Sequence, residues 1–235
     1  MYEQTQGYAA PQPVIAIDAS RRAQFITRTY THLLAAIIGF TAIEVVLFQT
    51  GLALPLAQAM VGVSWLLVLG GFMVAGWLFS GIAARAQTRS AQYFALAGYV
   101  VAEAIIFVPL LYVANAFAPG IIPQAGLYTL LVFTGLTGTV FFTRKDFSWL
   151  RTALTVAGFA AMGLIVVSMI FGFSLGTLFM AAMVALAAGY VLYSTSNVLH
   201  HYPVGSHVAA SLALFAAVAL MFYYIVQLLL SRSRD

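Results

Sequence analysis

Seven long apolar stretches follow one another along this 235-residue chain, with short loops between them. Each is close to the roughly 20 residues that a helix needs to cross the hydrocarbon core of a bilayer. Charged residues make up only 7% of the chain, against about 25% in soluble domains, so most of its surface cannot face water. The sequence therefore predicts an all-α integral membrane protein, a seven-transmembrane-helix bundle. The stretches are 29–48, 58–81, 92–114, 120–142, 152–171, 175–198 and 207–230.

Short polar segments flank this block. We expect residues 1–28 to form a polar N-terminal tail, residues 29–230 the seven-helix transmembrane domain and residues 231–235 a short C-terminal tail. Within the N-terminal tail, residues 18–28 are expected to begin a helix. Asp18 or Ser20 would cap it, because their side chains accept hydrogen bonds from the free N–H groups at a helix start.

The basic residues indicate how the helices alternate. If seven helices cross, eight of the ten Lys and Arg residues fall on one side, which predicts a cytoplasmic N-terminus. A six-span fold with one re-entrant stretch is the alternative, and it would place all ten on one side. We favour seven spans because the final stretch is long enough to cross. The basic bias and the short loops fit a bacterial inner (plasma) membrane. The eight are Arg21, Arg22, Arg28, Arg85, Arg89, Arg144, Lys145 and Arg151.

Several chemistries have no basis in the sequence. The chain contains no cysteine, which excludes disulfides, thiolate metal sites and a cysteine nucleophile. No phosphate-binding loop and no zinc-protease motif is present, so we expect no enzymatic activity. The net charge of +4 comes from basic residues beside the apolar stretches rather than from a run that could follow a nucleic-acid backbone, so no nucleic-acid partner is expected.

Two acidic residues lie within apolar stretches, and these are the candidate ion-pathway residues. Glu103 is near the middle of the stretch 92–114, six residues before Pro109, and Glu44 is in the outer half of 29–48. An ionisable residue at membrane depth is costly and is a functional candidate by default. If the two stretches are neighbours, both carboxylates would line one cavity and hold a cation or share a proton. The alternative is a neutral, protonated carboxyl that hydrogen-bonds a nearby carbonyl or hydroxyl.

The histidines form a weaker signal. His200, His201 and His207 surround the last loop, and His32 is near the start of the first stretch. Clustered histidines titrate near neutral pH or bind metals. Their spacing matches no metal-binding motif, however, and we expect no acidic residue beside them. A solvated loop is the simpler interpretation, and no metal site is predicted.

Several segments resemble the transmembrane Bax inhibitor motif family, also called the Bax inhibitor-1 family, in its bacterial type. The most specific match is Phe133-Thr134-Gly135-Leu136-Thr137 followed by Phe142-Thr143-Arg144-Lys145-Asp146-Phe147-Ser148. The segment Arg28-Thr29-Tyr30-Thr31-His32-Leu33 is similar to the family's entry to its first helix. Tyr193-Ser194-Thr195 and Ser211-Leu212-Ala213-Leu214-Phe215-Ala216-Ala217 fall where the family often has aspartate-containing patterns in its sixth and seventh helices.

The resemblance implies a bundle with the seventh helix at its centre. It also implies a link to pH-dependent calcium leak, to protection from cell death and, in bacteria, to a membrane protease. In the family's leak model, two aspartates share a proton and an arginine in the second helix latches onto them. Here the aspartate positions are Ser194 and Ala217, and the stretch 58–81 has no arginine. The paired-carboxylate sensor is therefore missing, and Glu103 and Glu44 are the acids left at membrane depth.

Two functional hypotheses follow. The first is a cation-leak protein that uses Glu103, with Glu44 as a second candidate and Ca²⁺ as the candidate ion. The second is a non-transporting regulator that binds a membrane protease or other membrane proteins through the tail 1–28 or the loop 143–151. A permease for a small organic solute is a third reading, for which the sequence offers no substrate-specific residues. In each case the lipid bilayer is the surrounding partner, and no cofactor is expected.

Overall fold

The computed structural model describes residues 13–63, 65–86 and 88–233, and within these ranges the chain forms a short 3-10 turn, Val14–Ala16, and eight α-helices. Seven of these described helices, all except α2, are long and apolar enough to cross a membrane, which confirms the predicted fold class. The helices are α1 (Ala19–Gln49), α2 (Ala53–Gly62), α3 (Trp65–Arg85), α4 (Arg89–Phe117), α5 (Ile121–Thr143), α6 (Leu150–Phe171), α7 (Gly176–His200) and α8 (His207–Arg232).

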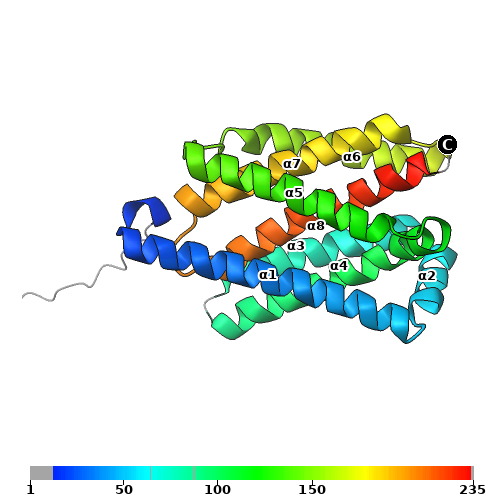
Figure 1. Ribbon diagram of the computed structural model, residues 1–235, viewed down its shortest axis with the longest axis horizontal. Coiled ribbons are helices and arrows are strands. Elements are labelled where there is room, and N and C mark those ends of the chain that lie inside the picture. The colour runs from blue at the N-terminus through cyan, green and yellow to red at the C-terminus, as the bar shows by residue number, and fades with distance from the viewer. Residues whose placement is uncertain (1–12, 64, 87, 234–235) are drawn as a thin grey trace, which may run out of the picture.

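The second predicted stretch, 58–81, is wrong as a single span. The structure divides this region into α2 and α3, with extended backbone at Val63 between them. Ala53 and Ala57 of α2 are buried in one cluster with Val108 of α4. Figure 1 shows α2 across the end of the bundle. An apolar run does not reveal such a break, because a helix across the bundle end and a helix through the bilayer are both apolar.

The centre of the bundle is α8, which contacts α1, α3, α4, α5 and α7 (Figure 1). This confirms the central seventh span that the family resemblance implied. Alanines supply much of its buried surface, and small side chains let helix backbones approach closely in lipid, where no hydrophobic effect draws helices together. The buried alanines of α8 are Ala209, Ala210, Ala217 and Ala219.

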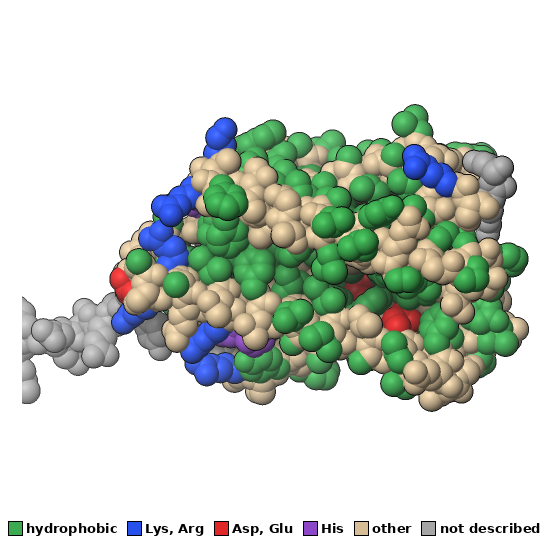
Figure 2. All heavy atoms as spheres, in the orientation of Figure 1, with side chains coloured by type: hydrophobic (Ala, Val, Ile, Leu, Met, Phe, Trp, Pro, Cys, Tyr) green, Lys and Arg blue, Asp and Glu red, His purple; other side chains and the backbone are tan. Residues whose placement is uncertain are grey.

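The long helices run back and forth between two ends of the molecule. The start of α1, the junction of α3 with α4 and the junction of α5 with α6 lie at one end (Figure 1). Figure 2 shows the Lys and Arg side chains concentrated at that end, and a mainly apolar surface along the middle of the visible face. The last helix, α8, runs from the basic end to the opposite end, which supports seven spans over the six-span alternative.

Residues 13–28 of the predicted N-terminal tail are within the described part of the chain. Helix α1 begins at Ala19, ten residues before the expected start of the transmembrane domain, and Asp18 caps it by accepting a hydrogen bond of 2.9 Å from the Arg21 N–H. Before the cap, Val14 is fully buried, and its N–H donates to the Tyr202 carbonyl at 3.0 Å. Residues 13–18 therefore form a strap against the loop between α7 and α8. Residues 1–12 of the predicted tail lie outside the described residues.

The contact between α3 and α4 provides a test of this packing. A Cβ added at Gly98 of α4 would meet the Phe79 ring of α3, whereas one at Gly71 of α3 would meet nothing within 4 Å. We expect Gly98→Ala to destabilise the protein by about 1–3 kcal/mol, because the Phe79 ring must shift. The midpoint of thermal unfolding in detergent measures this, with Gly71→Ala as the control. Equal midpoints for the two variants would contradict the close approach of α3 and α4.

Candidate functional site

Glu103 lies at the midpoint of α4, fourteen residues from either end of the helix. At 1.5 Å per residue, this places it about 21 Å from each end. Its side chain is only 5% exposed and lines a cavity of about 700 Å³ between α3, α4, α6, α7 and α8. Among the described residues that line this cavity, Glu103 is the one carboxylate, and no Lys or Arg is present. The predicted central acid is therefore in place, without a cationic partner in the cavity.

The other polar side chains of this cavity are hydroxyls and one amide. Tyr99 lies one helical turn before Glu103 on α4, and Tyr223 and Gln227 lie one turn apart on α8. Because residues four apart on a helix share a face, each pair presents its polar groups to the same space. The carboxylate therefore shares a mainly apolar cavity with a few hydroxyls and one amide, and with no second charged side chain.

The two family sensor positions fall in different surroundings. Ala217 is buried in α8 and lines the Glu103 cavity, so a methyl group stands there where the family often has an aspartate. Ser194 is buried in α7 and does not line that cavity. Next to it, the hydroxyl of Thr195 is buried without a hydrogen-bond partner among the described residues. The cavity that Ala217 lines therefore still contains one carboxylate, that of Glu103, which comes from α4 instead of α8.

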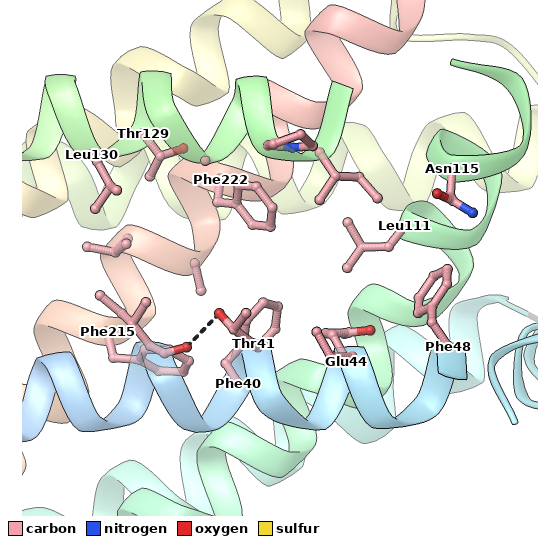
Figure 3. Close-up of a pocket in the computed structure, with 17 residues that line it drawn as sticks. Phe40, Thr41, Glu44, Phe48, Leu111, Asn115, Thr129, Leu130, Phe215 and Phe222 are labelled. Atoms are coloured by element: carbon pink, nitrogen blue, oxygen red, sulfur yellow. Dashed lines mark hydrogen bonds between the residues drawn. The ribbon is translucent and has the colours of Figure 1, made fainter. Parts of the chain in front are cut away.

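Glu44 lies in a separate cavity of about 520 Å³ between α1, α4, α5 and α8. It is 7% exposed, and neither carboxylate oxygen has a hydrogen-bond partner in the part of the chain that the structure describes. Figure 3 shows Glu44 pointing from α1 into this cavity. It lies five residues before the end of α1, far from the basic end of the molecule.

Aromatic rings separate the two carboxylates. Helices α1 and α4 are neighbours, which was the condition for Glu44 and Glu103 to line one cavity. Between them, however, the Phe107 ring of α4 lies 5.1 Å from the Phe40 ring of α1 and 5.7 Å from the Phe222 ring of α8. Phe107 lines the Glu103 cavity, whereas Phe40 and Phe222 line the Glu44 cavity. Glu44 and Glu103 therefore do not line one cavity.

The basic end of the molecule contains a polar network that the sequence did not reveal. The His201 Nε2–H donates to the Asp146 carboxylate at 2.8 Å, and the Ser196 hydroxyl donates to the same carboxylate at 3.3 Å. The Phe147 N–H in turn donates to the Ser196 oxygen at 2.8 Å. The expectation that no acid lies beside the histidines is wrong here. In a bundle of alternating helices, the α5–α6 loop with Asp146 and the α7–α8 loop with His201 lie at the same end. This alternation was the feature of the sequence that could have predicted their contact.

His32 belongs to a second network at this end. Its Nδ1 lies 2.6 Å from the Arg28 carbonyl and its Nε2 lies 3.1 Å from the Tyr93 hydroxyl, while its ring lies 5.0 Å from the ring of His207. Since a carbonyl can only accept, Nδ1 carries the proton that it donates. The two networks tie α1 to α4 and the α5–α6 loop to α7. No group of three or more metal-ligating side chains occurs within the described ranges.

The stabilisation of the fold by the Asp146 network depends on pH. Its slight burial opposes ionisation, but the Ser148 N–H and His201 bond the carboxylate and lower the pKa of Asp146 from its ordinary 3.8 to about 2. Because the folded-state pKa is depressed, the ionised carboxylate stabilises the fold above about pH 4. This contribution is lost as the pH falls towards 2.

The sequence matches the family described as "Inhibitor of apoptosis-promoting Bax1" over residues 22–234. The chain belongs to this family, the Bax inhibitor-1 family. Among its relatives, an uncharacterized protein of Pseudomonas aeruginosa is 27% identical over 222 residues, covering 91% of this chain and 92% of its own length. The protein named Bax inhibitor 1 of Schizosaccharomyces pombe is 31% identical over 176 residues, covering 70% of this chain and 61% of its own length. No solved structure matches the chain significantly.

Within this Bax inhibitor-1 family member, the Asp146 network can be tested by hydrogen exchange. We expect Asp146→Asn to speed amide exchange in the 144–149 loop, because the bonds at Ser148 and His201 weaken. Mass spectrometry of the detergent-solubilised protein at pH 7 measures this. Lys145→Gln, at an exposed neighbour, is the control. Unchanged exchange would show that the network does not hold the loop.

The pH dependence of stability is a second test of this network. The difference in unfolding midpoint between wild type and Asp146→Asn should shrink as the pH falls from about 4 to about 2.

Proposed function

We propose that this protein is a non-enzymatic cation-leak protein of the membrane, whose pathway passes through the Glu103 cavity. The observation that carries the proposal is the position of Glu103. Its carboxylate lies in the cavity lined by Ala217, the position where the family often has an aspartate. An acid at the bilayer midplane, in a cavity lined by no basic side chain, attracts either a proton or a cation. The cavity borders α8, so a change in its occupancy acts directly on the central helix.

Calcium is the first cation to test. Ca²⁺ takes six to eight oxygen ligands and usually more than one carboxylate. The cavity offers one carboxylate with hydroxyl and amide groups from Tyr99, Tyr223 and Gln227. Such a site would bind weakly, and conduction requires binding that is weak enough for the ion to leave. A leak therefore suits this donor set better than a storage site does.

The basic end of the bundle supports an orientation. Arg85 and Arg89 lie at the junction of α3 with α4, and Arg144 follows α5. Both junctions are at the same end of the molecule as the start of α1 (Figure 1). By the positive-inside bias, this end would be cytoplasmic, as would the N-terminus. A bacterial inner membrane is the proposed location, in keeping with the match to the Pseudomonas aeruginosa protein along most of both chains.

Calcium flux into liposomes tests the proposal. We expect wild-type protein to let external calcium enter the liposomes and reach an entrapped indicator at pH 6, 7 and 8. Glu103→Gln should lose at least 90% of this flux, because the amide keeps the shape of the side chain and removes its charge. Glu103→Asp, which restores the carboxylate, should recover part of it. Equal flux in wild type and Glu103→Gln would exclude a pathway through Glu103.

A non-transporting regulator is the second candidate, with a membrane protease or another membrane protein as partner. The α5–α6 loop favours it, because Arg144, Lys145 and Trp149 are exposed on a loop that the Asp146 network fixes. Arg and Trp are enriched at protein interfaces. If folded wild-type protein shows no flux at any pH, alanine at these three positions should remove co-purifying membrane proteins. An unchanged set of partners would exclude the loop as their binding surface.

A further inference from the structure

The Glu44 cavity lies away from the basic end of the molecule, and part of its lining is exposed on the outside of the bundle. It lies over α8 between α1 and α5, and two of its lining residues, Val45 of α1 and Leu130 of α5, are also exposed on the outer surface. Figure 2 shows acidic side-chain atoms on this mainly apolar face, in the half away from the basic end. The exposed positions Val45 and Leu130 give the cavity a side next to the bilayer, between α1 and α5. Two further lining residues, Asn115 and Pro123, are exposed near the end of the bundle.

The cavity contains one strong polar group with no partner. Both oxygens of Glu44 are buried and make no hydrogen bond to any residue that the structure describes. A buried polar group without a partner is costly, and a buried charge more so. No Lys or Arg lines the cavity. The carboxylate is therefore left to be satisfied by a proton or by a cation from outside the chain.

The lining is unsuited to an inorganic cation. Its hydroxyls are those of Thr41 and Thr129, which donate their protons to carbonyls of their own helices at 2.9 and 2.8 Å, as the dashed line in Figure 3 shows for Thr41, and keep their oxygen lone pairs. The amide of Asn115 is the other polar side chain of the lining. The side-chain oxygens of this lining are fewer than those of the Glu103 cavity and fewer than the six to eight oxygens that Ca²⁺ takes.

The same lining suits an organic cation. Four phenylalanines surround the space: Phe40, Phe48, Phe215 and Phe222 (Figure 3). Aromatic rings attract alkylammonium groups through cation–π interactions, and they also bind an apolar body. The volume of about 520 Å³ is within the range of roughly 300–1,000 Å³ found for small-molecule sites.

We propose that the Glu44 cavity binds an amphiphilic organic ammonium ion from the bilayer, with its cationic head on Glu44 and its apolar body among the phenylalanines. The occupant carries a net positive charge. A zwitterionic lipid headgroup is disfavoured, because its phosphate would find no basic side chain in the cavity. The site is independent of the Glu103 pathway, since the aromatic rings of Phe40, Phe107 and Phe222 stand between the two cavities.

Binding of a defined probe tests this site without measuring flux. The probe is radiolabelled 4-phenylbutyl-trimethylammonium, dialysed to equilibrium against the full-length protein in lipid nanodiscs, with empty nanodiscs as the baseline. We expect saturable binding to wild type, at least tenfold weaker binding to Glu44→Gln, and unchanged binding to Glu103→Gln, which removes the other membrane carboxyl. Glu44→Asp should recover part of the affinity. Size-exclusion elution and the unfolding midpoint establish that each variant is folded.

Three outcomes would overturn the proposal. The first is no saturable binding to folded wild-type protein, or equal binding to wild type and Glu44→Gln. The second is equal affinity for the neutral carbon isostere of the probe, which would make the cavity a site for apolar chains. The third is competitive displacement of the probe by Ca²⁺ at millimolar concentration, which would make Glu44 an inorganic cation site. Each result is independent of whether Glu103 supports flux.

Discussion

The packing of α8 among its neighbours is the interaction on which the other features of this bundle depend. In lipid, helices gain nothing from the hydrophobic effect by associating, so close backbone approach and van der Waals contact must hold them together. The alanines of α8 permit that approach on several sides at once. Large aromatic side chains from the same helix, such as Phe222 and Tyr223, then reach outward against α4. Small and large residues on one helix thus produce both the tight core and the cavities beside it.

Charge is placed sparingly around this core, and each membrane carboxylate has its own surroundings. Glu103 faces tyrosine hydroxyls and an amide in the cavity that Ala217 lines, whereas Glu44 faces phenylalanines near the lipid. Burying a carboxylate without a partner costs free energy in both cavities, but the polar side chains available to each carboxylate differ. A family member that lacks the paired aspartates can therefore keep acidic chemistry in the membrane and divide it between two unlike sites.

The sequence predicted the spans well, because hydropathy and length decide them. The final helix was expected over 207–230 and is α8, His207–Arg232, and Asp18 was one of the two expected caps of α1. The central acid could also be predicted, since Glu103 stands alone in an apolar stretch. The break between α2 and α3 could not, because it depends on Ala53 and Ala57 packing against α4. Likewise, the Asp146–His201 contact joins residues 55 positions apart, and the aromatic separation of the carboxylates requires three helices. Pattern within one segment carries no information on such contacts.

Glu103 is proposed to lie on a cation pathway and Glu44 in a cavity beside the lipid, and the absence of cysteine from the chain allows a direct test. Glu103→Cys and Glu44→Cys each introduce one thiol, whose labelling in liposomes can be followed with a small water-soluble methanethiosulfonate and with a lipid-soluble maleimide. We expect Glu103→Cys to react faster with the water-soluble reagent and Glu44→Cys to react faster with the lipid-soluble one. The reverse order, or the same preference at both positions, would exclude this assignment of the two carboxylates.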